Sequence, residues 1–395
     1  MTLENLEYRG ELQAKPSVFK VFHQMHSMQP AYRALFRLID FVGYPLAALA
    51  RKGKSLDNVS SIVVLRLDHI GDMILTTPVF RALKSRFPNA KLTVLCRRLT
   101  APLLRLNPYV DEVISLDVPW FSRETNDGWS KTTAFARKNH ARFDIGIELH
   151  TDPRNILLLS KISKTRVGYA SRGLGFMLNI KANYRREKLH IIERSLDVVR
   201  ALGADASPKT ELFLTKAEIN RARELLFRNK ANLRSCICIS PVAARANKNW
   251  LHVRFAELAD RLAEKHKSTV VFCGSKADKP VVDKILAGGK KQHLNLTGQL
   301  DLRELAAVIK LCKLFIGPDT GPMHIARAVE TPLIGLFGPV DPAVWGYDEQ
   351  NYRSIYHELP CSFCDKPGCS NRERYECMNS ITVDEVMAMA EKLLH

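Results

Sequence analysis

The sequence predicts an α/β protein made of two consecutive halves, each with a parallel sheet covered by helices on both faces. Short apolar, β-branched runs alternate with helical segments along most of the chain, which is the pattern typical of such sheets. The alternation stops once, at a linker-like stretch, and then starts again. The length of 395 residues also suits two domains better than a single core.

The first half is predicted over residues 58–205. Its expected strands are Ser61–Leu67, Lys91–Cys96, Glu112–Leu116 and Asp144–Leu149. Its expected helices are Asp72–Phe87, Asn155–Ser163 and Ile191–Leu202. The last helix ends at Gly203, and Gly203–Pro208 has the small and turn-forming residues of a linker.

The second half is predicted over residues 206–395. Its expected strands are Cys236–Ser240, Thr269–Cys273, Leu314–Gly317 and Pro332–Phe337. Its expected helices are Thr215–Arg228, Val253–Lys265, Leu302–Leu311 and Pro322–Val329. Ligands of doubly wound sheets bind at the carboxyl ends of the strands, where loops lead into helices. The polar residues of those loops are therefore the candidates for a site.

Residues 1–57 precede this alternation and differ from it in composition. Between Lys15 and Lys54, seven basic residues stand against one acidic residue, interleaved with aromatic and aliphatic residues at helical spacing. Such a segment can lie in the interface of an anionic membrane, or it can be a helical extension packed on the main body. No apolar run is long enough to span a membrane, and the first residues lack the layout of a secretory signal. We therefore expect a cytoplasmic protein.

The nine cysteines fall into two groups. Five lie in or beside apolar runs, where cysteine behaves as a small hydrophobic residue. The other four crowd into residues 361–377, at Cys361, Cys364, Cys369 and Cys377. A Cys-x-x-Cys pair is a common zinc chelate, but the remaining spacing is irregular. A structural zinc, disulfides and free thiols therefore all stay open.

Three of the predicted strand ends carry residues suited to a binding site. The first strand is followed by Asp68, His69, Gly71 and Asp72. Asp72 stands where the next helix begins, so it can simply cap that helix. Two carboxylates and a histidine at the ligand edge of a sheet are more than capping requires. A carboxylate there can take a proton from an attacking hydroxyl.

The loop after the strand Cys236–Ser240 is predicted to bind anions. Small residues follow the strand Cys236–Ser240 and lead to Arg245 and Lys248. Cations in such surroundings can meet phosphate oxygens without bulky obstruction. The alternative is an ordinary solvated basic loop.

The third strand end, at residues 317–324, is also predicted to bind an anion. Pro322 suits the first turn of a helix, and Thr320 or Asp319 can cap it. The free N–H groups at the start of that helix would then form an anion site, from Thr320, Gly321, Met323 and His324. The sequence contains neither a Walker loop nor a dinucleotide fingerprint after its first strand, which disfavours kinase and dehydrogenase functions.

Together these junctions resemble glycosyltransferase family 9, the lipopolysaccharide heptosyltransferase family. The resemblance covers the chain from about Ser60 to its end. It rests on motifs that are weak singly and specific in their order and spacing. They are R-L-D-H-I-G-D-x-x-x-T-x-P at Arg66–Pro78, P-x-A-x-x-x-x-K-x-W at Pro241–Trp250, N-L-T-G at Asn295–Gly298, P-D-T-G-P-M-H-x-A-x-A at Pro318–Ala328 and L-F-G-P at Leu336–Pro339.

The resemblance implies a GT-B fold, in which two Rossmann-like domains face each other across a cleft. It implies an inverting, metal-independent transfer of a sugar onto a lipopolysaccharide core or a related glycolipid, with ADP-heptose as the expected donor. The chain has no Asp-x-Asp triplet, which agrees with departure of the nucleotide without a metal. No cofactor is expected for the transfer.

The resemblance also implies roles for individual residues. The catalytic base maps onto Asp72, in the domain expected to bind the acceptor. The donor diphosphate maps onto Lys248, Asp319, Thr320, Gly321 and His324, with Met323 near the nucleotide. Support for the site is expected from Arg66, Asp68, His69, Gly71 and Arg245.

The acceptor side is expected to be basic, because the lipopolysaccharide core is rich in carboxylate and phosphate. The expected contacts are Arg97, Arg98, Arg172, Arg185 and Arg186, although a solvated charged face would have the same composition. The net charge of +18 agrees with anionic partners, including the cytoplasmic face of the inner membrane. No nucleic-acid motif is present, so no nucleic acid is expected as a partner.

Two other functions are compatible with the same residues. One is a non-catalytic module of the same fold that binds nucleotide sugars, and the other is a transferase that uses another nucleotide sugar. Only a transferase needs Asp72. The transfer reaction requires the loops around residues 72, 248 and 320 to meet at one gap.

Overall fold

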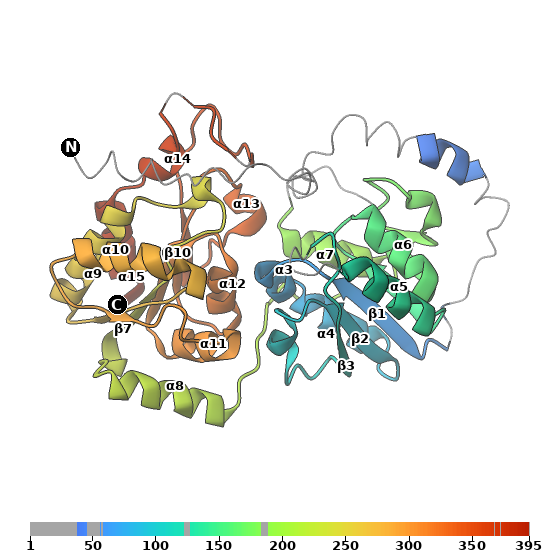
Figure 1. Cartoon of the computed structure of the whole chain (residues 1–395), viewed down its shortest axis with the longest axis horizontal. Coiled ribbons are helices and arrows are strands. Elements are labelled where there is room, and N and C mark those ends of the chain that lie inside the picture. The colour runs from blue at the N-terminus through green and yellow to red at the C-terminus, as the bar shows by residue number, and fades with distance from the viewer. Residues whose placement is uncertain are drawn as a thin grey trace.

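The computed structural model of this chain describes residues 38–45, 56, 58–121, 127–182, 189–366, 368–371 and 373–394. Two lobes lie side by side, each built around one six-stranded sheet (Figure 1). Every strand pair within the two sheets is parallel. The predicted fold class, two Rossmann-like domains, is confirmed.

The first sheet has the strand order β3-β2-β1-β4-β5-β6. Its strands are β1 (Ser61–Arg66), β2 (Lys91–Cys96), β3 (Glu112–Ser115), β4 (Phe143–Glu148), β5 (Ser163–Gly168) and β6 (Ile180–Lys181). Its helices are α3 (Ile70–Leu75), α4 (Thr77–Arg86), α5 (Gly128–Lys138), α6 (Pro153–Ile162) and α7 (Ile191–Arg200). The sequence did not predict β5, β6 or α5, which have weaker apolar patterns.

The predicted helix Asp72–Phe87 is wrong in two respects. It starts at Ile70, and it is divided into α3 and α4 at Thr76. Pro78 causes the break, because it has no N–H to bond the carbonyl of Ile74 and its ring crowds that carbonyl. The Thr77 hydroxyl donates to the same carbonyl instead, at 2.8 Å.

The second sheet has the order β12-β11-β10-β7-β8-β9. Its strands are β7 (Cys236–Ile239), β8 (Thr269–Phe272), β9 (Leu294–Asn295), β10 (Leu314–Pro318), β11 (Leu333–Leu336) and β12 (Tyr352–Ile355). The main helices of this lobe are α8 (Lys216–Arg228), α9 (His252–His266), α10 (Lys279–Gly288), α11 (Leu302–Leu311), α12 (Gly321–Ala328) and α15 (Val383–Leu394). Two shorter ones, α13 (Pro342–Trp345) and α14 (Glu376–Asn379), precede α15. The sequence did not predict β9, β12, α10, α13, α14 or α15.

Both sheets have the same topology and therefore the same ligand edge. The chain order reverses between β1 and β4 in the first sheet and between β7 and β10 in the second. A crevice opens at the carboxyl ends of the strands at such a switch point, and this is where doubly wound sheets bind ligands. The loops that follow β1, β4, β7 and β10 are thus the four that the fold brings to its two crevices.

Apolar side chains alternate between the two faces of the strands. Ile62 and Val64 point into one core cluster, while Val63 and Leu65 point into another. The first of these clusters continues into the second lobe, where it includes Phe315 of β10. The two lobes are therefore held together by apolar contacts as well as by the chain that links them.

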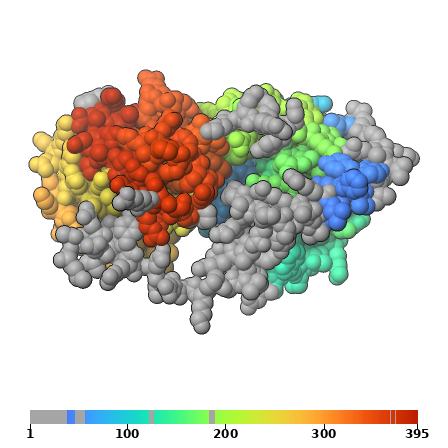
Figure 2. Space-filling view, turned by 90° about the horizontal axis from the view of Figure 1, so that it is seen from above, coloured from blue at the N-terminus to red at the C-terminus, as the bar shows by residue number. Residues whose placement is uncertain are grey.

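Residues 38–45 are helical and lie on the surface of the first lobe (Figure 2). Gly43 and Tyr44 face Phe176, and the Lys181 ammonium sits 4.1 Å from the centre of the Tyr44 ring. The rest of the predicted basic extension lies outside the described residues. No helix within the described ranges is both long and apolar enough to cross a bilayer.

Candidate functional site

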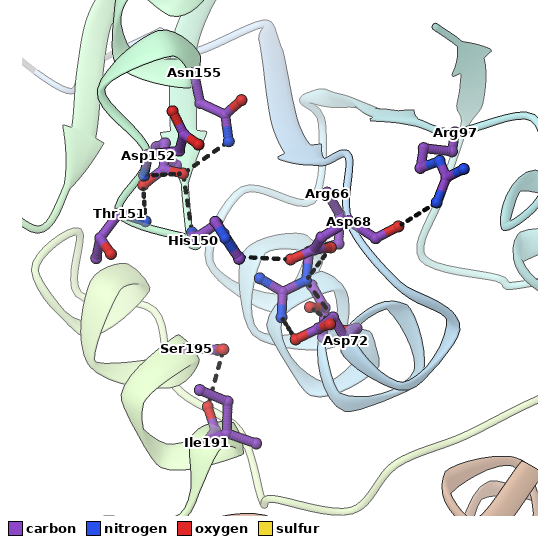
Figure 3. Close-up of polar contacts among 12 residues, drawn as sticks. Arg66, Asp68, Asp72, Arg97, His150, Thr151, Asp152, Asn155, Ile191 and Ser195 are labelled. Atoms are coloured by element: carbon purple, nitrogen blue, oxygen red, sulfur yellow. Dashed lines mark hydrogen bonds and ion pairs between the residues drawn. The ribbon is translucent and has the colours of Figure 1, made fainter. Parts of the chain in front are cut away.

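A chain of charged side chains follows the end of β1 (Figure 3). Arg66, the last residue of this strand, is buried, and its guanidinium lies between two carboxylates. Its Nη2 is 3.1 Å from Oδ1 of Asp72, and its Nε is 3.4 Å from Oδ1 of Asp68. Arg66 Nε also donates to the main-chain carbonyl of Asp72, at 3.1 Å. Arg66 therefore fixes both the side chain and the backbone of the predicted base.

Asp72 stands in the first turn of α3 and does not cap it. The N-cap position belongs to His69, whose side chain makes no capping hydrogen bond and is exposed. The alternative that Asp72 serves only as a helix cap is thus excluded by its position. One carboxylate oxygen of Asp72 is held by Arg66, and among the described residues the other has no hydrogen-bond partner, so it is available to a hydroxyl group.

The loop after β4 completes this cluster, and the sequence analysis missed it. The buried Glu148 carboxylate accepts hydrogen bonds from the N–H groups of His150 and Thr151, at 2.9 and 2.6 Å, and from the Asn155 side chain at 3.0 Å. Burial raises the pKa of Glu148, and it outweighs these hydrogen bonds, which lower that pKa. The signal was present, because Glu148, His150 and Asp152 form a polar group at a strand end, as at the other three junctions.

His150 bridges the two strands of the first crevice. Its Nδ1 lies 2.8 Å from Oδ2 of Asp68. Burial by itself would raise the pKa of Asp68, but the charge of Arg66 and the contact with His150 outweigh it and hold that pKa well below its usual range. For His150 burial acts in the opposite direction, yet Asp68, followed by Asp72 and Glu148, raises its pKa above the ordinary value.

The second lobe holds a matching cluster at the ends of β7 and β10. Lys248 Nζ lies 2.5 Å from Oδ2 of Asp319, and His324 Nε2 lies 3.4 Å from its Oδ1. Asp319 is buried, which would raise its pKa, but Lys248 and then His324 lower it to about 2. These three predicted donor residues are therefore gathered at the switch point of the second sheet.

The predicted anion site at the start of α12 needs a correction. Thr320 occupies the N-cap position, but neither its side chain nor that of Asp319 caps the helix. The Thr320 hydroxyl donates to the Pro318 carbonyl instead. The N–H groups of Met323 and His324 are bonded to the Thr320 carbonyl, at 3.1 and 3.4 Å. Only the N–H groups of Thr320 and Gly321, of the four predicted, have no such bond among the described residues. Met323 itself is fully buried in the core.

Two further residues, which the sequence did not single out, support His324. The hydroxyl of Tyr347 lies 2.8 Å from His324 Nδ1, in buried surroundings. His190 comes from the other lobe: its Nδ1 accepts from the N–H of Ile192, and its Nε2 lies 3.0 Å from the Gly346 carbonyl. Burial and then repulsion from His324 lower the pKa of His190 to about 4. His190 is thus a neutral link that joins α7 to the residue before Tyr347.

The two clusters meet where α3 lies against α12, between the lobes (Figure 1). A Cβ added to Gly71 would lie 2.7 Å from Cδ2 of His324, and one added to Gly321 would lie 2.7 Å from Cγ2 of Ile70. Glycine suits both positions because a side chain of the other lobe lies where a Cβ would be. The helix that carries Asp72 therefore touches the helix that carries Gly321 and His324, although their sequence positions are far apart.

Several predicted site residues lie elsewhere. Arg245 pairs with Asp365 at 2.6 Å and bonds the Lys366 carbonyl, so its guanidinium is not free for a phosphate. Arg98 is exposed beside Asp117, whereas Arg97 lies at the first cluster, where its Nη1 donates to the Asp68 carbonyl at 3.5 Å (Figure 3). Arg172 is partly exposed, and its acceptor role stays a prediction. Arg185 and Arg186 lie outside the described residues.

The four cysteines near the end of the chain form no disulfide in this structure. Within the described ranges, no three side chains of the His, Cys, Asp and Glu type are placed to hold a metal ion. Cys361 and Cys364 are exposed, and Cys369 and Cys377 are partly exposed, all with free thiols. Burial, and then the other three thiols, raise the pKa of Cys377 to about 11, so this thiol stays protonated. A structural zinc remains a prediction.

The chain is similar to known glycosyltransferases. Residues 133–374 match the family model described as glycosyltransferase family 9 (heptosyltransferase). The lipopolysaccharide heptosyltransferase 3 of Escherichia coli K12 is 29% identical over 342 residues, which cover 82% of this chain and 95% of that protein. The lipopolysaccharide core heptosyltransferase OpsX of Haemophilus influenzae is 26% identical, over 84% of this chain and 96% of its own length.

The fold is also found among solved structures. The ADP-heptose lipopolysaccharide heptosyltransferase II of E. coli superposes with a TM-score of 0.68. The alignment covers 85% of this chain and 98% of that one, at 23% identity. The present chain therefore shares its fold with the E. coli enzyme.

Proposed function

This chain belongs to glycosyltransferase family 9, the heptosyltransferases, and we propose that it transfers heptose from ADP-heptose to the core of lipopolysaccharide with inversion at the anomeric carbon. Membership makes it a glycosyltransferase. The sugar and the acceptor are those named for its relatives. The observation that carries the proposal is the contact of Gly71 with His324, because it brings the Asp72 loop to the predicted donor residues.

The acceptor hydroxyl would be activated by Asp72. Its free carboxylate oxygen takes the proton while the hydroxyl oxygen forms a bond to the anomeric carbon. Arg66 orients this carboxylate before the reaction, through contacts with its side chain and its main-chain carbonyl. Attack by the acceptor and departure of the nucleotide take place on opposite faces of the sugar, which inverts the configuration.

The leaving group would be stabilised by the second lobe. As the bond between the anomeric carbon and the phosphate oxygen breaks, its electron pair goes to ADP, and negative charge grows on the β-phosphate. Lys248 and the free N–H groups of Thr320 and Gly321 can stabilise that charge. Asp319 holds Lys248 in place at 2.5 Å, and contact between the lobes excludes water from the sugar.

The function is tested by transfer from ADP-heptose to a set of truncated lipopolysaccharide cores. We expect the wild-type chain to glycosylate at least one core, and Asp72→Asn to lose about a hundredfold in kcat while it still binds ADP. Undiminished transfer by Asp72→Asn would exclude this residue as the base. Binding of ADP-heptose without transfer to any core would support a non-catalytic module, and faster turnover of another nucleotide sugar would support a different donor.

We further propose that the enzyme binds the cytoplasmic face of the inner membrane through its N-terminal segment. Helix 38–45 has an apolar, exposed face: Leu38, Phe41 and Val42 are 62%, 78% and 54% exposed. In the sequence, basic residues stand on both sides of this helix, at Arg33 and Arg37 and at Arg51, Lys52 and Lys54. Apolar side chains flanked by cations match a bilayer interface with anionic headgroups.

Co-sedimentation with vesicles that contain anionic phospholipid tests this proposal. Deletion of residues 1–57, and separately the substitutions Leu38→Ser and Phe41→Ser together, should reduce the bound fraction, whereas ADP binding should persist. Equal binding of the wild type and the deletion variant would refute the membrane role.

A further inference from the structure

His150 lies at the ligand crevice of the first lobe, and none of the roles described above uses it. It follows β4, and β4 pairs with β1 at the switch point of that sheet. Asp68 and Asp72 reach the same crevice from the loop after β1 (Figure 3). The position of His150 thus corresponds to that of Asp319 in the second lobe, where the loops after β7 and β10 meet.

The main chain around His150 is built to hold this side chain in one place. Glu148 bonds the N–H groups of His150 and Thr151, and Thr151 has a positive φ of 63°, which a residue other than glycine rarely adopts. Such backbone strain persists only where the surrounding contacts fix it. Asp152 then caps α6 by accepting from the N–H of Arg154, at 2.8 Å. The loop is therefore clamped at both of its ends.

The imidazole ring is oriented by two neighbours. Asp68 faces Nδ1 at 2.8 Å, and the Phe121 ring meets the imidazole edge to face, with 5.0 Å between ring centres. Because the two ring nitrogens lie on different sides of the ring, Nε2 is directed away from Asp68. Within the described part of the chain no group hydrogen-bonds Nε2, and the side chain is 23% exposed. Nε2 is therefore available to a bound molecule.

The charges around His150 favour its protonated form. The carboxylates of Asp68, Asp72 and Glu148 act on it from the loop after β1, from α3 and from β4, and Arg66 is the cation that pairs with the first two. The pKa of His150 is raised, so the imidazolium persists to a higher pH than in an ordinary histidine. In this form Nε2 is a hydrogen-bond donor, and it cannot accept a proton.

We propose that His150 binds the acceptor sugar, with its Nε2–H donating to a hydroxyl next to the one that Asp72 deprotonates. This inference rests on the proposed transfer reaction. A carboxylate acceptor and an imidazolium donor that flank one crevice fit two neighbouring hydroxyl groups of a sugar ring. Asp68 fixes the direction of the ring and favours its protonated form, as a carboxylate behind a histidine commonly does. The pair would thereby select which hydroxyl reaches Asp72.

The test compares His150→Gln and His150→Ala with His140→Gln, which changes an exposed histidine in the same lobe. Transfer from ADP-heptose to a core acceptor is followed across pH for each full-length variant. We expect both His150 variants to raise KM for the acceptor about tenfold or more, while the Kd for ADP stays within about twofold. The wild type and His140→Gln should lose acceptor affinity as pH rises through the raised pKa of His150. His150→Gln should not show this loss, because glutamine donates at every pH.

Two results would overturn the inference. One is that His150→Gln has an unchanged KM for the acceptor and still loses acceptor affinity at high pH, as the wild type does. The other is that kcat of His150→Gln falls as much as that of Asp72→Asn and no longer decreases at low pH. This result would make His150 the base. If the wild type transfers to no core, the proposed function fails. The inference is then judged by calorimetric binding of the same truncated cores, where His150→Gln must bind more weakly than His140→Gln.

Discussion

Each buried charge at the gap has a partner of opposite sign. Arg66 lies between Asp68 and Asp72, and Lys248 lies against Asp319. Removing such groups from water is costly unless they are paired, so the partners fix one another in position. In the free enzyme Asp319 occupies Lys248, and a diphosphate must share that ammonium with it. Asp319 thus fixes the position of the Lys248 ammonium and weakens its attraction for the donor phosphates.

Replacement of Lys248 by alanine is expected to weaken ADP binding. The ammonium supplies a charge-assisted bond to the phosphate, and its loss leaves Asp319 buried without its main partner. We expect the Kd for ADP to rise about tenfold or more, as measured by calorimetry.

The control is Lys279→Ala, which removes an exposed lysine that pairs with Asp283 at 2.9 Å. An exposed pair of this kind contributes little, so both ADP binding and stability should be unchanged. An unaltered Kd in Lys248→Ala would remove this residue from the donor site.

At the scale of elements, the contact between α3 and α12 decides whether the two loops can work together. Each helix presents a glycine to the other at its first turn, Gly71 on α3 and Gly321 on α12. A side chain at either glycine would push the helices apart. These two glycines are therefore constrained by the partner lobe rather than by their own helix.

The substitution Gly71→Ala is expected to reduce kcat by about tenfold or more, because its Cβ would meet the His324 ring at 2.7 Å. If the His324 ring or helix α3 moves to make room for this Cβ, Asp72 shifts relative to the donor residues. The reacting groups then lose their alignment. Gly288→Ala serves as the matched change, since a Cβ there would have nothing within 4 Å. If steady-state kinetics show equal kcat for both variants, the contact does not contribute to the reaction.

For the whole molecule, Arg303 is a buried tie between the lobes. It belongs to α11, and it pairs with Glu218 of α8 through two bonds, at 2.5 and 2.8 Å. Its Nη1 reaches the carbonyls of Pro102 and Arg105 in the first lobe, and its Nη2 that of Phe213 between the lobes. One guanidinium thus joins both lobes and the connecting chain.

Stability is expected to depend on this tie at low pH. The bond to Arg303, reduced somewhat by burial, lowers the pKa of Glu218 from 4.5 to about 2. The carboxylate therefore contributes about 3 kcal/mol above pH 4.5, and this contribution is lost as the pH falls towards 2. Arg303→Met should unfold at lower urea concentration at pH 7 and should show less of this acid-dependent loss. A wild-type pH dependence in Arg303→Met would contradict the role of the pair.

Much of the fold could be predicted from local sequence patterns. The strands β1, β2, β7 and β10 are continuous apolar runs, because a parallel strand is buried on both faces. The short strands β6 and β9 and the terminal helix α15 were missed. The two strands have only two residues each, and their pairing is decided by neighbours rather than by their own composition.

The candidate site was predictable only in part. Asp72, Lys248 and Asp319 stand at strand ends, so their chemistry and the topology rule point to them directly. Arg245 satisfied the same rule and is paired elsewhere, with Asp365. His150 also stands at a strand end and was missed there, whereas Tyr347 was missed because its significance lies in its contact with His324, which no local sequence pattern indicates.

The sequence by itself determined that this chain would form two parallel sheets with charged loops at their carboxyl edges, because buried strands and helix starts depend on residues close together in the chain. Only the tertiary structure decided that Gly71 meets His324, that Asp68 holds His150 and that Tyr347 supports the donor site. Those contacts depend on strand order and on how the lobes pack, and both are set by the free energy of the whole molecule rather than of any one segment.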